Sequence, residues 1–163
     1  MKEKIIELVP LVDLDISELT QIMKRAFDKD SREFLGEMTG GPPGYDNGDF
    51  LRKYGLMVST SAFKVTLDGK AVGGVILWIN DNGENFLGNL FIDSELQDRG
   101  IGQSVWNMVE KKYPETKVWR TETPIFSRRN HNFYVNKCGF HIVSIENPKD
   151  MHEGEYKMEK QMR

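Results

Sequence analysis

Residues 97–106 read QDRGIGQSVW and follow the apolar run FLGNLFID at residues 86–93. Two glycines one residue apart are followed at once by apolar residues at helical spacing. This pattern is typical of a strand that turns tightly into the N-terminus of a helix. Helix N-termini carry unpaired N–H groups and a partial positive charge, so such a turn can bind a phosphate without a lysine. The glycines therefore indicate either a ligand that approaches the backbone closely or a tight turn alone.

The other segments alternate between strand and helix patterns. The expected strands lie at residues 4–10, 62–67, 71–79, 85–93, 116–122, 140–146 and 155–162. The expected helices run from Asp15 to about Asp28, from Gly102 to about Pro114, and over residues 127–138. This order predicts an α/β fold with a mixed sheet and helices on its faces.

One segment, residues 36–50 (GEMTGGPPGYDNGDF), is dense in glycine and proline and is expected to be a loop. A loop of this length is either a binding segment or lid, or a mobile surface connector. Both interpretations stay open on the sequence.

Composition excludes several classes of function. The 163 residues fit one domain, residues 1–163, and a net charge of −3 argues against broad nucleic-acid binding. A lone cysteine cannot form an internal disulfide, and no segment has the pattern of a signal peptide or a membrane span. We therefore expect a cytoplasmic protein that binds neither nucleic acid nor membrane.

Three kinds of phosphate loop compete for residues 97–106. A Walker loop needs a lysine that the sequence lacks after Gly102, and a dinucleotide fingerprint needs a third glycine where Val105 stands. The spacing that fits is Gln97-x-x-Gly100-x-Gly102, between strand and helix. With it, and with NHNFYVNKCGF at residues 130–140, the chain resembles the GNAT superfamily of acyl-CoA-dependent N-acyltransferases. The resemblance spans nearly the whole chain and implies a central, mostly antiparallel sheet with helices on both faces.

The resemblance implies transfer of an acetyl group from the co-substrate acetyl-CoA to a primary amine. Backbone groups of the fourth strand are expected to contact the acyl and pantetheine part, and the glycine loop the pyrophosphate. The implied coenzyme-binding residues are Leu90, Ile92, Gln97, Asp98, Arg99, Gly100, Ile101, Gly102, Gln103, Ser127 and Asn130. For Arg99 the alternative is a solvated surface charge, and for Ser127 and Asn130 it is helix capping.

For catalysis, the resemblance makes Tyr134 the candidate general acid, because a phenol can protonate the departing thiolate. Tyr134 precedes Gly139 by five residues, where the family pattern has four, so either the helix end absorbs one residue or the ring points elsewhere. The alternative is a tyrosine packed under the sheet. Glu122 is the first candidate base, with Glu84 and His131 behind it, and water is the alternative.

The acceptor is expected to enter opposite the coenzyme, beside the first helix and residues 40–55 (GGPPGYDNGDFLRKYG). Tyr45, Asp46 and Asp49 are the candidate substrate-binding residues, since acidic and aromatic side chains favour a cation. A polyamine, an aminoglycoside, an amino acid and a protein amine all remain open as acceptors, as does a homodimer. No metal is expected, because the histidines and Cys138 form no ligand spacing.

Two other interpretations compete with the enzyme. The chain is alternatively a non-catalytic acyl-CoA-binding sensor or scaffold of the same fold, or an unrelated α/β protein with a chance glycine turn. Coenzyme binding would exclude the unrelated α/β protein. Turnover would then distinguish the enzyme from the sensor or scaffold.

Overall fold

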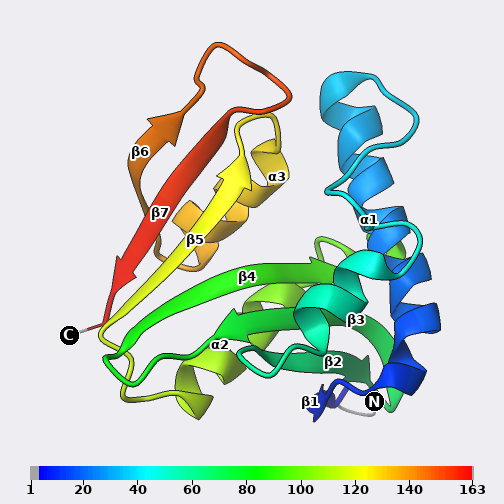
Figure 1. The fold of residues 1–163 in the computed structure, drawn as a ribbon, viewed down its shortest axis with the longest axis vertical. Helices are drawn as coiled ribbons and strands as arrows, with labels where there is room; N and C mark the ends of the chain where they lie inside the picture. Colours follow the sequence, from blue (N-terminus) through cyan, green and yellow to red (C-terminus); the bar gives the residue numbers. More distant parts are fainter. Residues whose placement is uncertain (1–3, 163) are drawn as a thin grey trace.

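The predicted strands pair into one seven-stranded sheet in the computed structural model, which describes residues 4–162 (Figure 1). The strands are β1 (Ile6–Pro10), β2 (Ser61–Leu67), β3 (Lys70–Trp78), β4 (Glu84–Ile92), β5 (Val118–Pro124), β6 (His141–Glu146) and β7 (Glu155–Gln161). Their order in the sheet is β1-β2-β3-β4-β5-β7-β6. Every pair is antiparallel except β4–β5, which a helix connects and which is parallel. The predicted mixed, mostly antiparallel sheet is confirmed.

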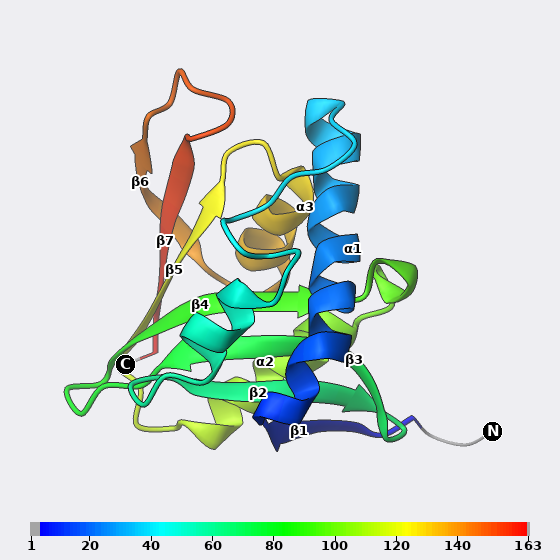
Figure 2. The same ribbon diagram turned by 45° about the vertical axis from the view of Figure 1, so that its right-hand side comes forward.

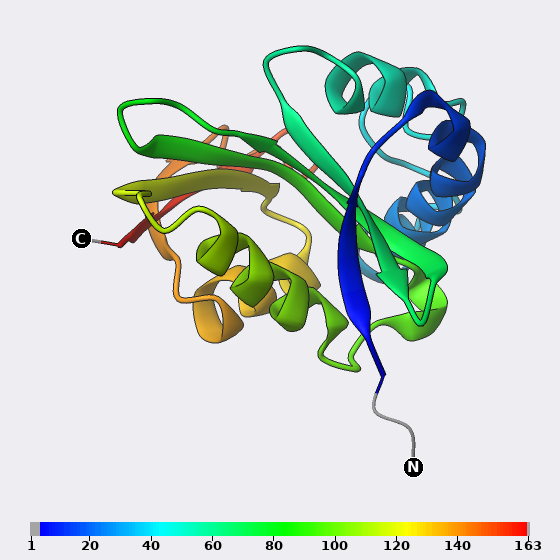
Figure 3. The ribbon, with the colours of Figure 1, turned by 90° about the horizontal axis from the view of Figure 1, so that it is seen from below.

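Helices cover both faces of this sheet. They are α1 (Ile16–Leu35), α2 (Ile101–Lys112) and α3 (Arg128–His131), with short helical segments η1 (Asp13–Asp15), η2 (Leu51–Gly55), η3 (Ser94–Leu96) and η4 (Asn132–Lys137). Seen from below, α2 and α3 lie on one face, and α1 and η2 on the other (Figure 3). Among residues 4–162, no helix combines the length and the apolar character needed to cross a bilayer.

Each face of the sheet has its own hydrophobic core. Side chains alternate along β3, so Val75 and Leu77 pack toward α2 while Ile76 packs toward α1. Trp106 of α2 and Trp119 of β5 are fully buried, with ring centroids 5.0 Å apart in an edge-to-face arrangement. The sheet is thus fixed from both sides and forms a rigid support for the segments that leave it.

Helix α1 extends well past the predicted end at Asp28, so that boundary was wrong. The apolar stripe stops at Phe27, but Gly36 provides the actual helix stop with φ 70°. Ion pairs four residues apart, such as Lys24–Asp28 at 2.6 Å, support the polar last turns. The extension matters because it brings the C-terminal half of α1 beside α3 (Figure 2).

The segment of residues 127–138, predicted as one helix, divides into α3 and the π-helical η4. In η4 the N–H of Cys138 donates to the carbonyl of Phe133 at 3.0 Å, five residues back. A π-helical turn holds one residue more than an α-helical turn. The helix therefore absorbs the extra residue between Tyr134 and Gly139.

Candidate functional site

Strands β4 and β5 pair over only part of their length. The parallel ladder joins residues 84–87 to residues 118–121, and beyond it the strands separate (Figure 1). A β-bulge marks this point. Ile76 and Leu77 of β3 are consecutive but pair with residues 89 and 87 of β4, so Gly88 between them has no partner on β3. From Gly88 to Ile92, the side of β4 that faces β5 has no neighbouring strand in the described part of the chain. This free edge forms one wall of an open cleft.

The glycine loop forms the end of this cleft. Asp98 and Gly100 both have left-handed backbone conformations, with φ of 63° and 80°. The first hydrogen bond of α2 runs from the N–H of Ser104 to the carbonyl of Gly100 at 3.1 Å. The preceding N–H groups, those of residues 101–103, therefore have no partner within the helix, and all three residues line the cleft. This is an arrangement that binds anions.

Gly102 has a reason to be glycine that the sequence did not reveal. A Cβ at this position would lie 3.0 Å from Cε1 of Phe133, whose ring packs against the turn. A side chain of η4 thus approaches Gly102 closely, and the approach of a ligand to the same turn stays a prediction. Gly100, by contrast, has open space around its Cα and is needed for its positive φ.

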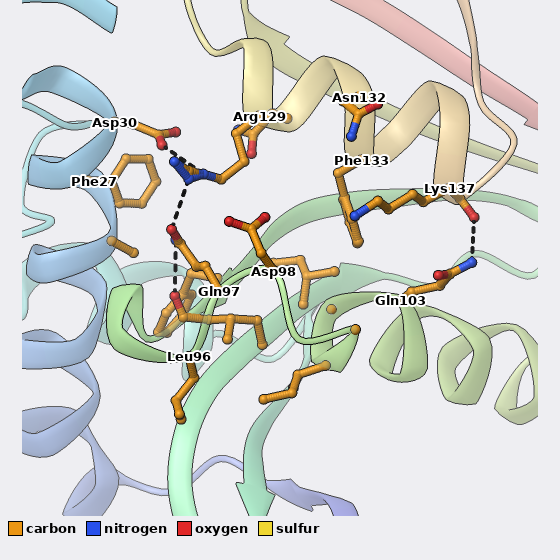
Figure 4. A pocket seen from close by; sticks show the side chains of 18 residues that line it. Phe27, Asp30, Leu96, Gln97, Asp98, Gln103, Arg129, Asn132, Phe133 and Lys137 are labelled. Carbon is orange, nitrogen blue, oxygen red and sulfur yellow. Dashed lines mark hydrogen bonds and ion pairs between the residues drawn. The ribbon is translucent and has the colours of Figure 1, made fainter. Parts of the chain in front are cut away.

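Arg129 crosses the cleft from α3 (Figure 4). Its Nη1 donates to Oε1 of Gln97 at 3.0 Å, and its guanidinium forms ion pairs with Asp30 and Glu33 of α1. The amide of Gln97 also reaches the carbonyl of Ile92 at 3.5 Å. Arg129 and Gln97 therefore link α1, the end of β4 and α3. The sequence singled out Gln97 but missed Arg129, because an arginine on a polar helix face looks like a surface charge.

Asp30 is a carboxylate that lines the cleft and that the sequence missed. Oδ2 accepts a hydrogen bond from Ser127 at 2.9 Å. Burial raises the pKa of Asp30, against the hydrogen bond from Ser127 and the charge of Arg129. The sequence did contain a signal for Asp30, because it stands four residues after Ala26 and so continues the buried stripe of the helix. The predicted helix ended before Asp30, and the signal was therefore missed.

Most of the predicted coenzyme-binding residues lie together. Those that line the cleft are Leu90, Ile92, Gln97, Asp98, Gly100, Ile101, Gly102, Gln103 and Asn130. Arg99 is exposed and outside this set, and Ser127 is buried as the N-cap of α3. Lys137 of η4, which the sequence did not single out, also lines the cleft (Figure 4). Its carbonyl accepts from Nε2 of Gln103 at 3.0 Å, which ties η4 to the start of α2.

Tyr134 lies beneath the cleft wall, in the core. Its ring packs edge-on against Phe133 and Phe140, and only 6% of its surface is exposed. Burial raises the pKa of the phenol, which therefore stays protonated at neutral pH. Tyr134 is not among the residues that line the cleft, so its role as an acid stays a prediction.

The three candidate bases all have partners. Glu122 accepts from Lys157 at 2.5 Å, Glu84 from Arg120 at 3.1 Å, and Nε2 of His131 lies 3.0 Å from the carbonyl of Pro124. Glu122 stands one residue after the last β5 residue that pairs with β4. Its part in proton transfer stays a prediction.

The candidate acceptor residues are divided by the structure. Tyr45 is buried, and its hydroxyl donates to Oδ1 of Asp28 at 2.6 Å. Burial and this bond raise the pKa of Tyr45 to about 12. Tyr45 therefore anchors the loop of residues 36–50 to α1, whereas Asp46 and Asp49 are exposed. Asp49 lies 3.8 Å from Arg52, so part of its charge is balanced.

Comparison with known sequences gives two matches. The model of the acetyltransferase (GNAT) family matches residues 20–140. A Bacillus subtilis protein named uncharacterized protein YrkN is 38% identical over 136 residues, which cover 82% of this chain and 71% of YrkN.

Comparison with solved structures gives the same architecture. An acetyltransferase from Thermus thermophilus superposes with a TM-score of 0.76 at 16% identity, over 96% of both chains. The PaiA N-acetyltransferase from Thermoplasma acidophilum, solved in complex with coenzyme A, has a TM-score of 0.74 at 17% identity, over 96% of this chain and 98% of that one. At these identities the likeness is one of fold.

Proposed function

The chain belongs to the GNAT acetyltransferase family, and we propose that it transfers an acetyl group from acetyl-CoA to a primary amine. The observation that carries the proposal is the cleft between β4 and β5. A strand edge without a partner strand and a helix N-terminus with unpaired N–H groups lie in this one cavity. An extended amide-containing arm that ends in a pyrophosphate needs both features.

The residues of the cleft fit coenzyme A. The N–H groups of residues 101–103 and the cation of Lys137 suit the pyrophosphate, and the free edge of β4 suits the amides of the pantetheine arm. The coenzyme A bound to PaiA, a protein of this fold, supports the same assignment here. Asp98 lies at the same end of the cleft and opposes an anion there, so Lys137 is needed to offset its charge.

In the proposed reaction the neutral amine nitrogen attacks the thioester carbonyl. A C–N bond forms, the C–S bond breaks, the nitrogen loses a proton to a base, and the thiolate takes a proton from an acid. We assign the acid to Tyr134. Burial raises the pKa of Tyr134, so the phenol keeps its proton at neutral pH.

We assign the base to Glu122, and the direction of its side chain supports this. Thr123 Oγ1 accepts from Asn130 of α3, so Thr123 faces α3 and its neighbour Glu122 faces the opposite side. That side is the one covered by α1 and η2, where we expect the acceptor to enter. On this side Glu122 forms an ion pair with Lys157.

The second candidate function is a sensor or scaffold that binds acyl-CoA without turnover. The observation in its favour is that Tyr134 lies behind the cleft wall and that Glu122 is paired with Lys157. Release of free thiol from acetyl-CoA, measured over a panel of primary amines, tests the proposal. Amine-dependent release supports an acetyltransferase, whereas acetyl-CoA binding without release from any amine supports the sensor.

A further inference from the structure

A second cavity lies on the α1 side of the sheet, against the bulged part of β4. Aromatic side chains from three separate segments form its walls: Phe50 and Tyr54 from the N-cap and the last turn of η2, Trp78 from β3 and Phe86 from β4. Ring centroids follow one another at 4.8 Å from Phe50 to Tyr54, 6.2 Å to Trp78 and 6.1 Å to Phe86. We propose that this aromatic cavity binds an aromatic ring carried by the acceptor amine. The inference rests on the proposed acetyl transfer.

The cavity depends on a glycine in its floor. A Cβ on Gly88 would lie 2.3 Å from Cζ3 of Trp78 and 3.1 Å from its Cε3. Trp78 can lie across β4 only because residue 88 has no side chain. The same glycine is the extra residue of the β-bulge, so one position shapes both the wall and the point at which β4 and β5 separate.

The position of the aromatic cavity fits an acceptor site. Gly88 and Asn89 line it, while the next residues of the strand, Leu90 to Ile92, line the coenzyme cleft. The two cavities therefore border consecutive residues of β4. Phe86 of β4 pairs with Arg120 of β5, so their side chains lie on the same face of the sheet. Glu122 stands two residues after Arg120 and therefore lies further along that face. We propose that an amino group on a ring bound here is directed to the strand gap, on the face of the sheet that carries Glu122.

The volume and the uncharged lining of the aromatic cavity both favour an apolar ring as its ligand. The aromatic cavity has a volume of about 190 Å³. The aromatic cavity is open to solvent, and its volume exceeds the roughly 150 Å³ of an enclosed apolar cavity that binds benzene, so it has space for one ring. None of the described residues that line it is charged, and Tyr54 already has Nζ of Lys53 at 5.1 Å from its ring centroid. An apolar ring therefore fits better than a polycation such as a polyamine.

The first test measures binding without turnover. Saturation-transfer NMR compares 2-phenylethylamine with propylamine, which has the amino group but no ring. We expect transfer to the phenyl protons of 2-phenylethylamine and none to propylamine. Tyr54→Ala should weaken the phenyl signal, and Val58→Ala, a fully exposed position in the following loop, should not. Equal signals from both amines in the wild type, or no phenyl signal at all, would overturn the inference. This outcome does not depend on whether the protein binds acetyl-CoA.

The second test measures turnover. We expect kcat/KM for 2-phenylethylamine to exceed that for propylamine by about tenfold or more, the ratio that aromatic contacts typically provide. Tyr54→Ala should remove most of that ratio. Acetylation of phenylalanine amide or of a peptide with N-terminal phenylalanine would support the inference and identify the source of the ring. Acetyl-CoA-dependent release with no preference for a ring would contradict the aromatic cavity and leave the acetyltransferase intact.

Discussion

The ring of Phe133 lies where a side chain on Gly102 would have to be, because a Cβ there would come within 3.0 Å of Cε1. This contact joins the first turn of α2 to η4. Both residues line the coenzyme cleft, so its shape depends on their packing.

Gly102→Val should weaken acetyl-CoA binding by at least about tenfold, since the valine displaces Phe133 and moves the turn that presents the N–H groups. Calorimetry measures the affinity. Asn107→Val is the matched control, because it places the same β-branched residue on the exposed face of α2. Equal affinities in the two variants would mean that the packing of Gly102 on Phe133 does not set the cleft.

Arg129→Met should destabilise the fold by about 2–3 kcal/mol, because it leaves Asp30 in a buried site without its cation. Arg128→Met changes the neighbouring exposed arginine and should stay within about 0.5 kcal/mol of the wild type. Urea unfolding measures both. A loss in Arg128→Met as large as that in Arg129→Met would contradict the bridging role of Arg129.

The ion pair between Asp93 and Arg25 should make stability depend on pH. The hydrogen bond from Arg25, 2.7 Å long, holds the pKa of Asp93 below its ordinary value, against burial. A lowered folded pKa stabilises the fold above the unfolded pKa of about 3.9, and this stability is lost as pH falls below it.

Asp93→Asn should therefore cost about 1 kcal/mol at pH 7, a modest value because Arg25 is 44% exposed. The difference from the wild type should shrink as the pH falls below about 4, the unfolded pKa. Chemical unfolding at several pH values measures it. A difference that stays constant from neutral pH down through this range would exclude the charge of Asp93 as its cause.

Several features could be predicted from the sequence because local patterns determine them. The strands follow from alternation, and Gly100 was rightly assigned to a turn, since its positive φ is a property of the local backbone. Nine of the eleven predicted coenzyme-binding residues lie in one cleft for the same reason. Apart from Asn130, they belong to one strand, the loop after it and the first turn of α2.

Features that depend on packing between distant segments could not be predicted. The ring of Phe133 packs against Gly102, and this contact could not be predicted because Phe133 stands far along the chain. Asp30 was missed because the end of α1 depends on Gly36 and on ion pairs more than on the apolar stripe. The aromatic cavity joins η2, β3 and β4, and no pattern in the sequence connects those segments.

Tyr134→Phe should lower kcat by about a hundredfold or more while leaving acetyl-CoA affinity unchanged, because it removes the proposed acid and keeps the ring. Tyr113→Phe, next to Trp119 in the core, is the control and should keep wild-type activity. Because burial raises the pKa of Tyr134, wild-type activity should not decline through ionisation of this phenol near pH 10, where a free tyrosine ionises. Full activity in Tyr134→Phe would assign proton donation to another group.

Glu122→Gln should lower kcat by about a hundredfold, because it removes the proposed base and keeps the size of the side chain; steady-state kinetics with acetyl-CoA and an accepted amine measure it. Glu146→Gln is the matched control, because Glu146 also pairs with Lys157, at 3.5 Å, from the edge strand β6. Equal losses in the two variants would indicate that charge around Lys157 matters and that Glu122 is not the base.

The central claim is that the cleft between β4 and β5 holds acetyl-CoA, and calorimetric titration of the wild-type protein with acetyl-CoA tests it most directly. We predict binding at about micromolar affinity, a range in which the free energy is near −8 kcal/mol. The absence of binding to folded protein would contradict the assignment of the glycine loop and of the free β4 edge, and with them the proposed function.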